Sequence, residues 1–410
     1  MTGFGRGEHS DGKRSITVEI KSVNHRYGDI NVKMPRRYSF AEEAIKSTVK
    51  KYISRGKVDV SVSVENLTED DVTGFEQAPV IGLNETCSAN NYVTDSPAGG
   101  TALATGVRTR NGYCGLDPEG NQLTSILRKA QAMGKKTGIV VNTTLTEATP
   151  ASFYAGVTSR KMTYEIAQQF TESGVDVAIG SGLDHFIGRP DSLDLTATLI
   201  DKGYDVYLNW SSVLNTSSDR FVGILPMADV HRQESGRSEA GAAAGHEVCL
   251  AARLAAASGE EGASDLSEPE VYLQKATAKA LEVLSRDNEQ GYFLMIESAL
   301  IDGYGHNNDS EGMIAEMKEF DALLRQLAAY VDQNPGTLLV VTADHETGGT
   351  WLNYTDYEVG GSSPITMSYS SRGHSGVVVP VFAYGTGAES FAGVMKNTDI
   401  PKKIESLMTE

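Results

Sequence analysis

Apolar and polar residues alternate along the first 66 residues of the chain. The alternation covers Ile16, Val18 and Ile20, then Ile30, Val32 and Met34, and finally Val58, Val60, Val62 and Val64. A period of two predicts strands with one solvated face. Between the second and third strands, Ser39 is expected to cap a helix that continues to Ile53 and ends before Gly56. Residues 1–66 therefore predict a small α+β segment of order β-β-α-β.

Beyond residue 66 the apolar residues form nearly continuous runs separated by helical stretches. The runs are "TGIVVN" (137–142), "VDVAIGSG" (175–182), "YFLMIES" (292–298), "TLLVVTADHE" (337–346) and "VVVPVFAYG" (377–385). Buried parallel strands have this composition, and the helix predicted over 313–330 is typical of the layers that cover them. Residues 67–410 therefore predict a three-layer α/β sandwich with a mostly parallel central sheet. Residues 234–270, rich in Ala, Gly, Ser and Glu, are interpreted as an excursion in which His246 is solvated.

Residues 90–106, "NNYVTDSPAGGTALATG", place an Asp and a Ser beside a run of small side chains. The stretch predicts a strand ending at Asn91–Val93, then a helix with Ser96 as N-cap and Pro97 at its first position. A helix N-terminus favours an anion. Taken alone, the stretch is better explained by an ordinary cap with close helix–sheet packing, so the rest of the chain has to decide.

Charge divides the 410-residue chain unevenly. Residues 1–66 hold 13 Lys+Arg and 8 Asp+Glu, a net +5, and the total of −18 leaves −23 for the remainder. An acidic body argues against nucleic acid as its main ligand. No apolar run is long enough to span a membrane, and "MTGFGRGEHSDGKRS" lacks the apolar core of a signal peptide. The three cysteines show no metal spacing, and a Cys87–Cys114 bridge stays open.

Acidic and histidine residues collect at the ends of the predicted body strands. "IESALIDGYGH" holds Glu297, Asp302 and His306, "TADHETGG" holds Asp344 and His345, and "SRGHSG" holds His374. A single Asp-His pair is usually a polar turn. Three such clusters at strand ends predict a metal centre, because ligands bind there in open α/β sheets. Mixed His and carboxylate ligands suit zinc, and oxygen ligands suit magnesium.

These segments resemble the motifs of bacterial alkaline phosphatases, in the same order. The resemblance covers about residues 75–400 and also includes "YVTDSPAGGTALATG", "TEATPASFYAGVTSRK" and "GHSGVVVPVFAYGTGA". It implies that Ser96 is a nucleophile and that Arg160 holds phosphate in a bidentate fork. It further implies a first zinc on Asp302, His306 and His374, a second zinc on Asp344, His345 and Ser96, and magnesium on Thr149 and Glu297. Asp95 and Glu147 would support these residues.

Two departures from the family pattern bear on activity. The family's first strand ends in a Gly-Asp-Gly-Met type turn whose Asp bridges the second zinc and the magnesium, and no such segment precedes Ser96 here. Asp70 and Asp71 follow no apolar strand and are poor replacements. We therefore expect a weakened second zinc site and an incomplete magnesium site. Glu147 stands where the family usually has Asp or His, and Pro97 where Ala or Gly is usual.

Residues 1–66 resemble the N-terminal part of YicC-type proteins, a bacterial family linked to RNA cleavage. The resemblance lies in "MTGFGRGE", "VEIKSVNHRYGDINVKMPR" and "SRGKVDVSV". The rest of that family's chain is absent, so its activity is not carried over. His25 is interpreted as a structural turn residue.

Three hypotheses follow. The first is a zinc-dependent phosphomonoesterase, impaired by loss of the bridging Asp. The second is a metal- or phosphate-binding body of weak or no turnover, fused to a basic, RNA-associated segment. The third is a join of two gene fragments. A phosphodiesterase stays open, whereas a sulfatase lacks its cysteine nucleophile. Expected partners are small phosphate monoesters, nucleic acid through residues 1–66, and a second copy in a dimer. The compartment is not assigned.

Overall fold

The computed structural model describes residues 3–10, 14–25, 28–34, 41–53, 55–66, 73–230, 272–352 and 367–409. Ser39, Asp70, Asp71, Cys249 and the 234–270 excursion with His246 lie outside the described residues. Among the described helices, none has both the length and the apolar character needed to cross a bilayer.

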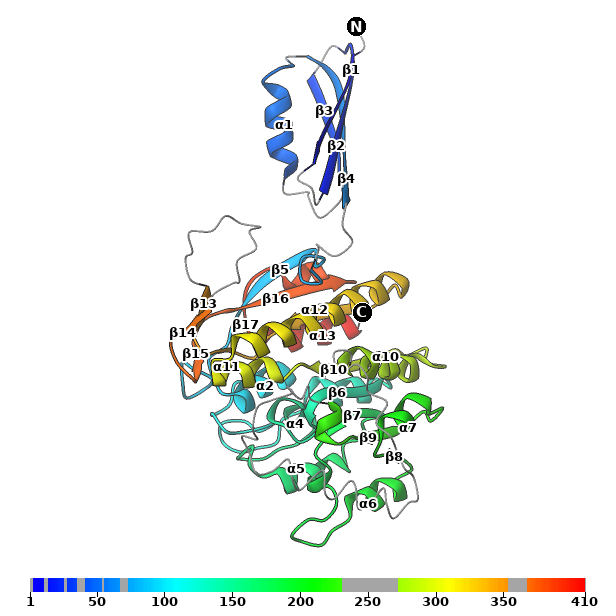
Figure 1. Cartoon of the computed structure of the whole chain (residues 1–410), viewed down its shortest axis with the longest axis vertical. Coiled ribbons are helices and arrows are strands. Elements are labelled where there is room, and N and C mark those ends of the chain that lie inside the picture. Colours follow the sequence, from blue (N-terminus) through cyan, green and yellow to red (C-terminus); the bar gives the residue numbers. More distant parts are fainter. Residues whose placement is uncertain are drawn as a thin grey trace.

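The N-terminal head is a four-stranded sheet with one helix (Figure 1). Its strand order is β1-β2-β4-β3, and Val58 and Val60 of β4 are buried in one cluster with Val49 of the helix. The strand β1 was missed by the sequence prediction, because "GFGRGEHS" is glycine-rich and shows no apolar alternation. The elements are β1 (Gly3–Ser10), β2 (Arg14–Val23), β3 (Gly28–Lys33), α1 (Glu42–Lys50) and β4 (Gly56–Asn66). The predicted domain boundary after residue 66 stays a prediction.

The centre of the body is a five-stranded, all-parallel sheet of order β10-β6-β7-β9-β8. Three of the five predicted apolar runs form strands of this sheet, namely β6, β7 and β10, and side chains on both of its faces are buried. The runs at 337–346 and 377–385 were also expected to be parallel strands, but they form an antiparallel pair in a second sheet. Ile139 and Val141 face one core cluster, whereas Val140 between them faces the other. The strands are β6 (Lys136–Thr144), β7 (Val177–Ser181), β8 (Asp205–Tyr207), β9 (Phe221–Ile224) and β10 (Tyr292–Glu297).

A second sheet of four strands has the order β11-β16-β5-β17. Within it β16 runs antiparallel to both neighbours. Its strands are β5 (Val80–Glu85), β11 (Leu338–Thr342), β16 (Val379–Gly385) and β17 (Gly393–Lys396). Two short pairs lie near the site, namely β12 (Glu346–Thr347) with β15 (His374–Ser375), and β13 (Thr350–Leu352) with β14 (Met367–Tyr369).

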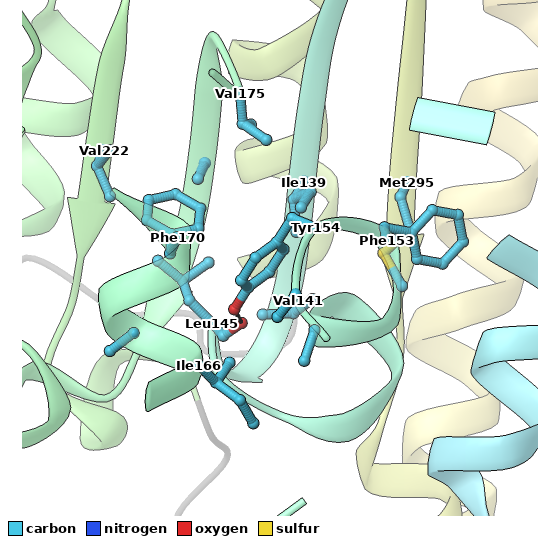
Figure 2. Packing of buried hydrophobic residues seen from close by; sticks show 14 of the residues in the cluster. Ile139, Val141, Leu145, Phe153, Tyr154, Ile166, Phe170, Val175, Val222 and Met295 are labelled. Atoms are coloured by element: carbon cyan, nitrogen blue, oxygen red, sulfur yellow. Dashed lines mark hydrogen bonds between the residues drawn. The ribbon is translucent and has the colours of Figure 1, made fainter. Parts of the chain in front are cut away.

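Helices cover both faces of the parallel sheet. The face shown in Figure 2 packs Phe170 against Tyr154, whose hydroxyl donates to the Leu145 carbonyl at 2.8 Å. The predicted α/β sandwich is therefore confirmed. The helices are α2 (Ser96–Thr105), α3 (Ile126–Ala132), α4 (Ala148–Tyr154), α5 (Thr163–Phe170), α6 (Leu195–Asp201), α7 (Trp210–Asn215), α8 (Met227–Val230), α10 (Tyr272–Ser285), α11 (Leu300–Asn307), α12 (Ser310–Gln333) and α13 (Asp399–Thr409).

Two details of the 90–106 stretch differ from the prediction. Residues 91–93 form a loop and not a strand, since the Asn91 side chain accepts from the Val93 N–H at 3.0 Å and closes a local turn. The N-cap of α2 is Asp95 and not Ser96, because the Asp95 carboxylate accepts from the Ala98 N–H at 3.1 Å. The Ser96 hydroxyl is thus not used as a cap.

Candidate metal and phosphate site

The helix α2 brings Ser96 to the centre of the candidate site. Ser96 is almost buried, and its Oγ lies 3.1 Å from Nε2 of His345. The small residues of α2 permit the close approach that follows. A Cβ added at Gly99 would lie 3.0 Å from Cβ of Asp344, and one at Gly100 would lie 3.1 Å from Cα of Thr149. The run of small side chains thus lets α2 pack directly against residues expected to hold metals.

Asp302, His306 and His374 form one compact cluster. Their ligand atoms all lie within 4.8 Å of one another. Nε2 of His306 and Nε2 of His374 are 3.1 Å apart. Asp302 Oδ1 lies 3.4 Å from Nε2 of His306 and 3.6 Å from Nε2 of His374. The residues predicted to hold the first zinc, which come from two distant segments, α11 and β15, are therefore adjacent in space.

Hydrogen bonds hold the two imidazoles of this cluster in one tautomer. His306 Nδ1 donates to the Arg372 carbonyl at 2.6 Å, and His374 Nδ1 donates to the Thr94 carbonyl at 2.9 Å, since a carbonyl can only accept. In the neutral rings both Nε2 lone pairs then face each other beside a carboxylate. Burial, followed by the neighbouring His345, lowers the pKa of His374 and favours its neutral form. A cation bound between them would attract both lone pairs and the carboxylate, so this set of donor atoms fits zinc.

The second predicted group gathers around His345. Its Nε2 lies 3.2 Å from Asp344 Oδ2, and its ring stacks on that of His374 with centroids 3.4 Å apart. Thr347 Oγ1 donates to Asp302 Oδ1 at 2.5 Å and accepts from His345 Nδ1 at 3.2 Å. Thr347 thus links both groups and leaves the Nε2 lone pair of His345 directed at Ser96 and Asp344, where a metal would bind. Sequence reasoning did not select Thr347, although it lies within "TADHETGG".

Glu297 ends β10 at the same edge and is the clearest unsatisfied group of the site. Its Oε2 is buried without a hydrogen-bond partner among the described residues. Burial, and then the charges of Asp344 and Glu147, raise the pKa of Glu297 to about 8, although a hydrogen bond with Thr149 opposes the shift. A buried orphan oxygen beside other carboxylates fits a hard cation such as magnesium.

Arg160 also reaches Ser96. Its Nη1 donates to Ser96 Oγ at 3.4 Å, and its Nη2 pairs with the Glu147 carboxylate. Glu147 is also the N-cap of α4 and accepts from the Ala148 N–H at 3.0 Å. The guanidinium is thus placed to bind an oxyanion at Ser96, with Glu147 competing for it.

The site as a whole unites a hydroxyl at a buried helix start, a guanidinium and two adjoining groups of metal-type ligands. Such a site can hold a tetrahedral oxyanion and displace one of its substituents. The structure brings together all the predicted residues: Ser96, Arg160, Asp302, His306, His374, Asp344, His345, Thr149 and Glu297, with Asp95 and Glu147 supporting.

Comparison with known proteins agrees with a site for this kind of displacement at an oxyanion. The family model for alkaline phosphatase matches residues 61–368, and the one for the N-terminal region of YicC-like endoribonucleases matches residues 1–88. The chain belongs to the alkaline phosphatase family of phosphomonoesterases. The two matches overlap over residues 61–88.

Individual relatives give the same result. Alkaline phosphatase 4 of Bacillus subtilis is 28% identical over 377 aligned residues, covering 75% of each chain. Alkaline phosphatase of Escherichia coli K12 is 28% identical, covering 80% of this chain and 78% of its own. The solved alkaline phosphatase of the Antarctic bacterium TAB5 aligns with a TM-score of 0.69 and 28% identity over 93% of this chain and 96% of its own. A variant of that enzyme is described with Mg bound in its M3 site.

Proposed function

We propose that the chain hydrolyses small phosphate monoesters through a phosphoserine at Ser96. The observation that supports this most directly is the placement of Ser96 Oγ between Arg160 Nη1 and His345 Nε2. Asp302, His306 and His374 would hold a first zinc, Asp344 and His345 with Ser96 a second, and Thr149 with Glu297 a magnesium. Bound there, the metals would supply positive charge for the attacking and departing oxygens.

The residues of the chain then divide the reaction between them. Arg160 orients the phosphate through its guanidinium. Ser96 Oγ gives its proton to solvent and attacks phosphorus, and the bond to the leaving alcohol breaks as that oxygen takes a proton from solvent. Water then attacks the phosphoserine, releases inorganic phosphate and returns a proton to Ser96 Oγ. Thr347 keeps the Nδ1 proton of His345 in place, so the Nε2 lone pair stays directed at the site.

The test is a comparison of the wild-type chain with Ser96→Ala, both loaded with zinc and magnesium. We expect slow turnover of p-nitrophenyl phosphate by the wild type, and a phosphoserine trapped by acid quench and located by mass spectrometry. Turnover by Ser96→Ala should fall by roughly 10⁴–10⁶-fold, as when other catalytic nucleophiles are removed. Ser211→Ala, on the exposed side of α7, is the matched control. Unchanged turnover in Ser96→Ala contradicts the assignment, and zinc binding without turnover favours the non-catalytic alternative.

An RNA-associated role for the head is the second candidate, and the charge pattern of its solvated sheet face does not support it. Lys21 lies directly opposite Asp59, which also accepts from Asn31, and Glu19 lies 3.6 Å from Lys21. Acids and bases thus alternate on this face, whereas a phosphate backbone attracts unopposed basic groups. Gel-shift titration of the chain with single-stranded RNA at 50 and 200 mM salt would test this candidate.

The proposed dimer is supported by an apolar area on the second sheet. Leu83 and Val394 are cross-strand partners, and with Ile81 they are exposed by 41, 68 and 59% respectively. Exposed apolar side chains that gather on one face mark interaction surfaces. Light scattering during gel filtration should give twice the chain mass, and Val394→Lys should restore the monomer.

A further inference from the structure

A cavity of about 430 Å³ lies at the C-terminal end of α4, the helix whose N-terminal end holds Glu147 and Thr149. Its volume is within the range of small-molecule sites, roughly 300–1,000 Å³. None of the residues described in its wall belongs to the metal and phosphate site. The wall comes from the segment before α3 and from the ends of α4 and α5, and it includes Gln122, Thr124, Arg128, Phe153, Ala155 and Gln169.

The wall contains a half-buried guanidinium without a counter-charge. The hydrogen bonds of Arg128 within the described chain go to uncharged oxygens, among them the carbonyls of Ser173 and Tyr154. Glu172, an acidic residue of the same wall, pairs its carboxylate with Lys202 at 2.7 Å instead. Burial lowers the pKa of Arg128, because a charge removed from water is costly unless it is paired. An anion in the cavity would supply the missing pair.

Unused donors and apolar surface lie around this guanidinium. Nε of Arg128 takes no part in its hydrogen bonds to the carbonyls. The exposed Gln122 amide and Thr124 hydroxyl have no partner among the described residues. Leu123, Phe153 and Ala155 add apolar surface to the wall. Sites for small molecules combine such apolar lining with a few polar groups that fix the orientation of the ligand.

We infer that this cavity binds a small organic acid, with its carboxylate on Arg128 and its apolar body against Leu123 and Phe153. A guanidinium presents N–H groups in a planar fork, which matches the two oxygens of a carboxylate. The Gln122 amide and the Thr124 hydroxyl can donate to the same oxygens at the rim. Binding in this cavity does not depend on the proposed reaction at Ser96.

The probe is 2-naphthoate, titrated calorimetrically into the full chain loaded with zinc and magnesium. The control compound is 2-naphthamide, which has the same shape and no charge. We expect saturable one-to-one binding of 2-naphthoate, at least about 10-fold tighter than that of the amide, because a charge-assisted contact replaces a neutral one. Equal affinity of the two compounds would overturn the inference, and so would the absence of saturable binding.

Two substitutions locate the probe in the cavity. Arg128→Gln should weaken 2-naphthoate binding at least about 10-fold, whereas Arg108→Gln should not change it. Arg108 is the matched control, since it is also half-buried and donates to a carbonyl, that of Glu85. Thr124→Trp fills the exposed rim and leaves the bonds of Arg128 intact, so it tests the site even if Arg128→Gln does not fold. Wild-type affinity in Thr124→Trp would overturn the inference.

The phosphate site is the other place where a carboxylate could bind. We expect Arg160→Ala to bind 2-naphthoate as the wild type does, and inorganic phosphate not to displace it. Displacement by phosphate, or lost binding in Arg160→Ala, would place the probe at Ser96 and overturn the inference. Failure of the chain to hydrolyse p-nitrophenyl phosphate would instead contradict the proposed reaction and leave the cavity site standing.

Discussion

At Arg160 the guanidinium already pairs with a carboxylate that a phosphate has to displace. Glu147→Gln removes that charge and keeps an acceptor for the Ala148 N–H, so inorganic phosphate should inhibit more strongly. We expect a change of about 3- to 10-fold and no more, because the Arg160 and Glu147 side chains are both partly exposed and solvent weakens their pairing. The measurement is the competitive inhibition constant of phosphate. Glu172→Gln, which breaks a surface pair with Lys202, is the control and should change nothing. Arg160→Ala should shift the constant in the opposite direction.

The two described cysteines differ in reactivity. Both thiols are free, so the bridge left open by the sequence is not formed, and burial raises the pKa of Cys114 to about 12. At pH 8 about one molecule in ten thousand then has a Cys114 thiolate, which is the reactive form. In a Cys249→Ser background, Ellman's reagent should titrate one thiol, Cys87, in the native chain and two in urea. Rapid reaction of two native thiols would contradict the burial of Cys114.

The identity of the site residues could be predicted from the sequence, but their orientation could not. His306 and His374 are set by carbonyls of Arg372 and Thr94, and main-chain acceptors leave no mark in the residue types. The N-cap of α2 could not be predicted either. Asp and Ser are equally good N-caps, and only the backbone conformation decides that Asp95 is the cap. The difference matters because a capping Ser96 would have its hydroxyl engaged.

At the scale of the elements, the position of α2 depends on the absence of side chains. Gly99→Ala would place a Cβ 3.0 Å from Cβ of Asp344 and 3.1 Å from its carbonyl oxygen, so one of the two must move. We expect a loss of about 1–3 kcal/mol in the free energy of unfolding, together with weaker zinc binding at Asp344 and His345. Thermal unfolding and zinc titration would measure both.

The control for this substitution lies in another helix. Gly303 in α11 has no atom within 4 Å of an added Cβ, so Gly303→Ala should be neutral or stabilise by up to about 1 kcal/mol. If Gly99→Ala behaves like Gly303→Ala in both measurements, then α2 does not determine the position of Asp344.

Strands and helices with strong patterns were predicted well, and elements without them were not. The long helix expected over 313–330 is observed as α12, and the apolar runs are observed as β6, β7, β10, β11 and β16. The helix of the head is shorter than expected, beginning at Glu42 after an Ala41 that makes no side-chain cap. The sequence could not show that, among the described residues, β10 pairs with β6 alone and β11 with β16 alone, because strand pairing depends on contacts between distant segments.

At the scale of the whole molecule, the metal content should depend on which groups of metal-binding residues are complete and which are not. The cluster of Asp302, His306 and His374 is complete within the described chain, so we expect nearly one equivalent of zinc there. The second zinc, on Asp344 and His345, should be substoichiometric, and magnesium at Glu297 largely absent. Mass-spectrometric metal analysis after dialysis against both ions would measure this, and His374→Ala should remove the first zinc selectively.

The same reasoning predicts how activity could be restored within one chain. Replacing the head and linker before residue 75 by an apolar strand that ends in Gly-Asp-Gly supplies a carboxylate beside Glu297 and Ser298, whose Oε2 and Oγ are buried without partners among the described residues. Each buried group that gains a partner removes a cost of about 1–3 kcal/mol, so the replaced chain should unfold at higher temperature and also bind the second zinc and magnesium. Turnover of p-nitrophenyl phosphate should rise with them, because the attack of Ser96 depends on the charge beside it. A strand ending in Gly-Asn-Gly should recover the stability and not the metals. Full occupancy of all three sites in the present chain would mean instead that a residue outside the described ranges, Asp70 or Asp71 first, already supplies the carboxylate.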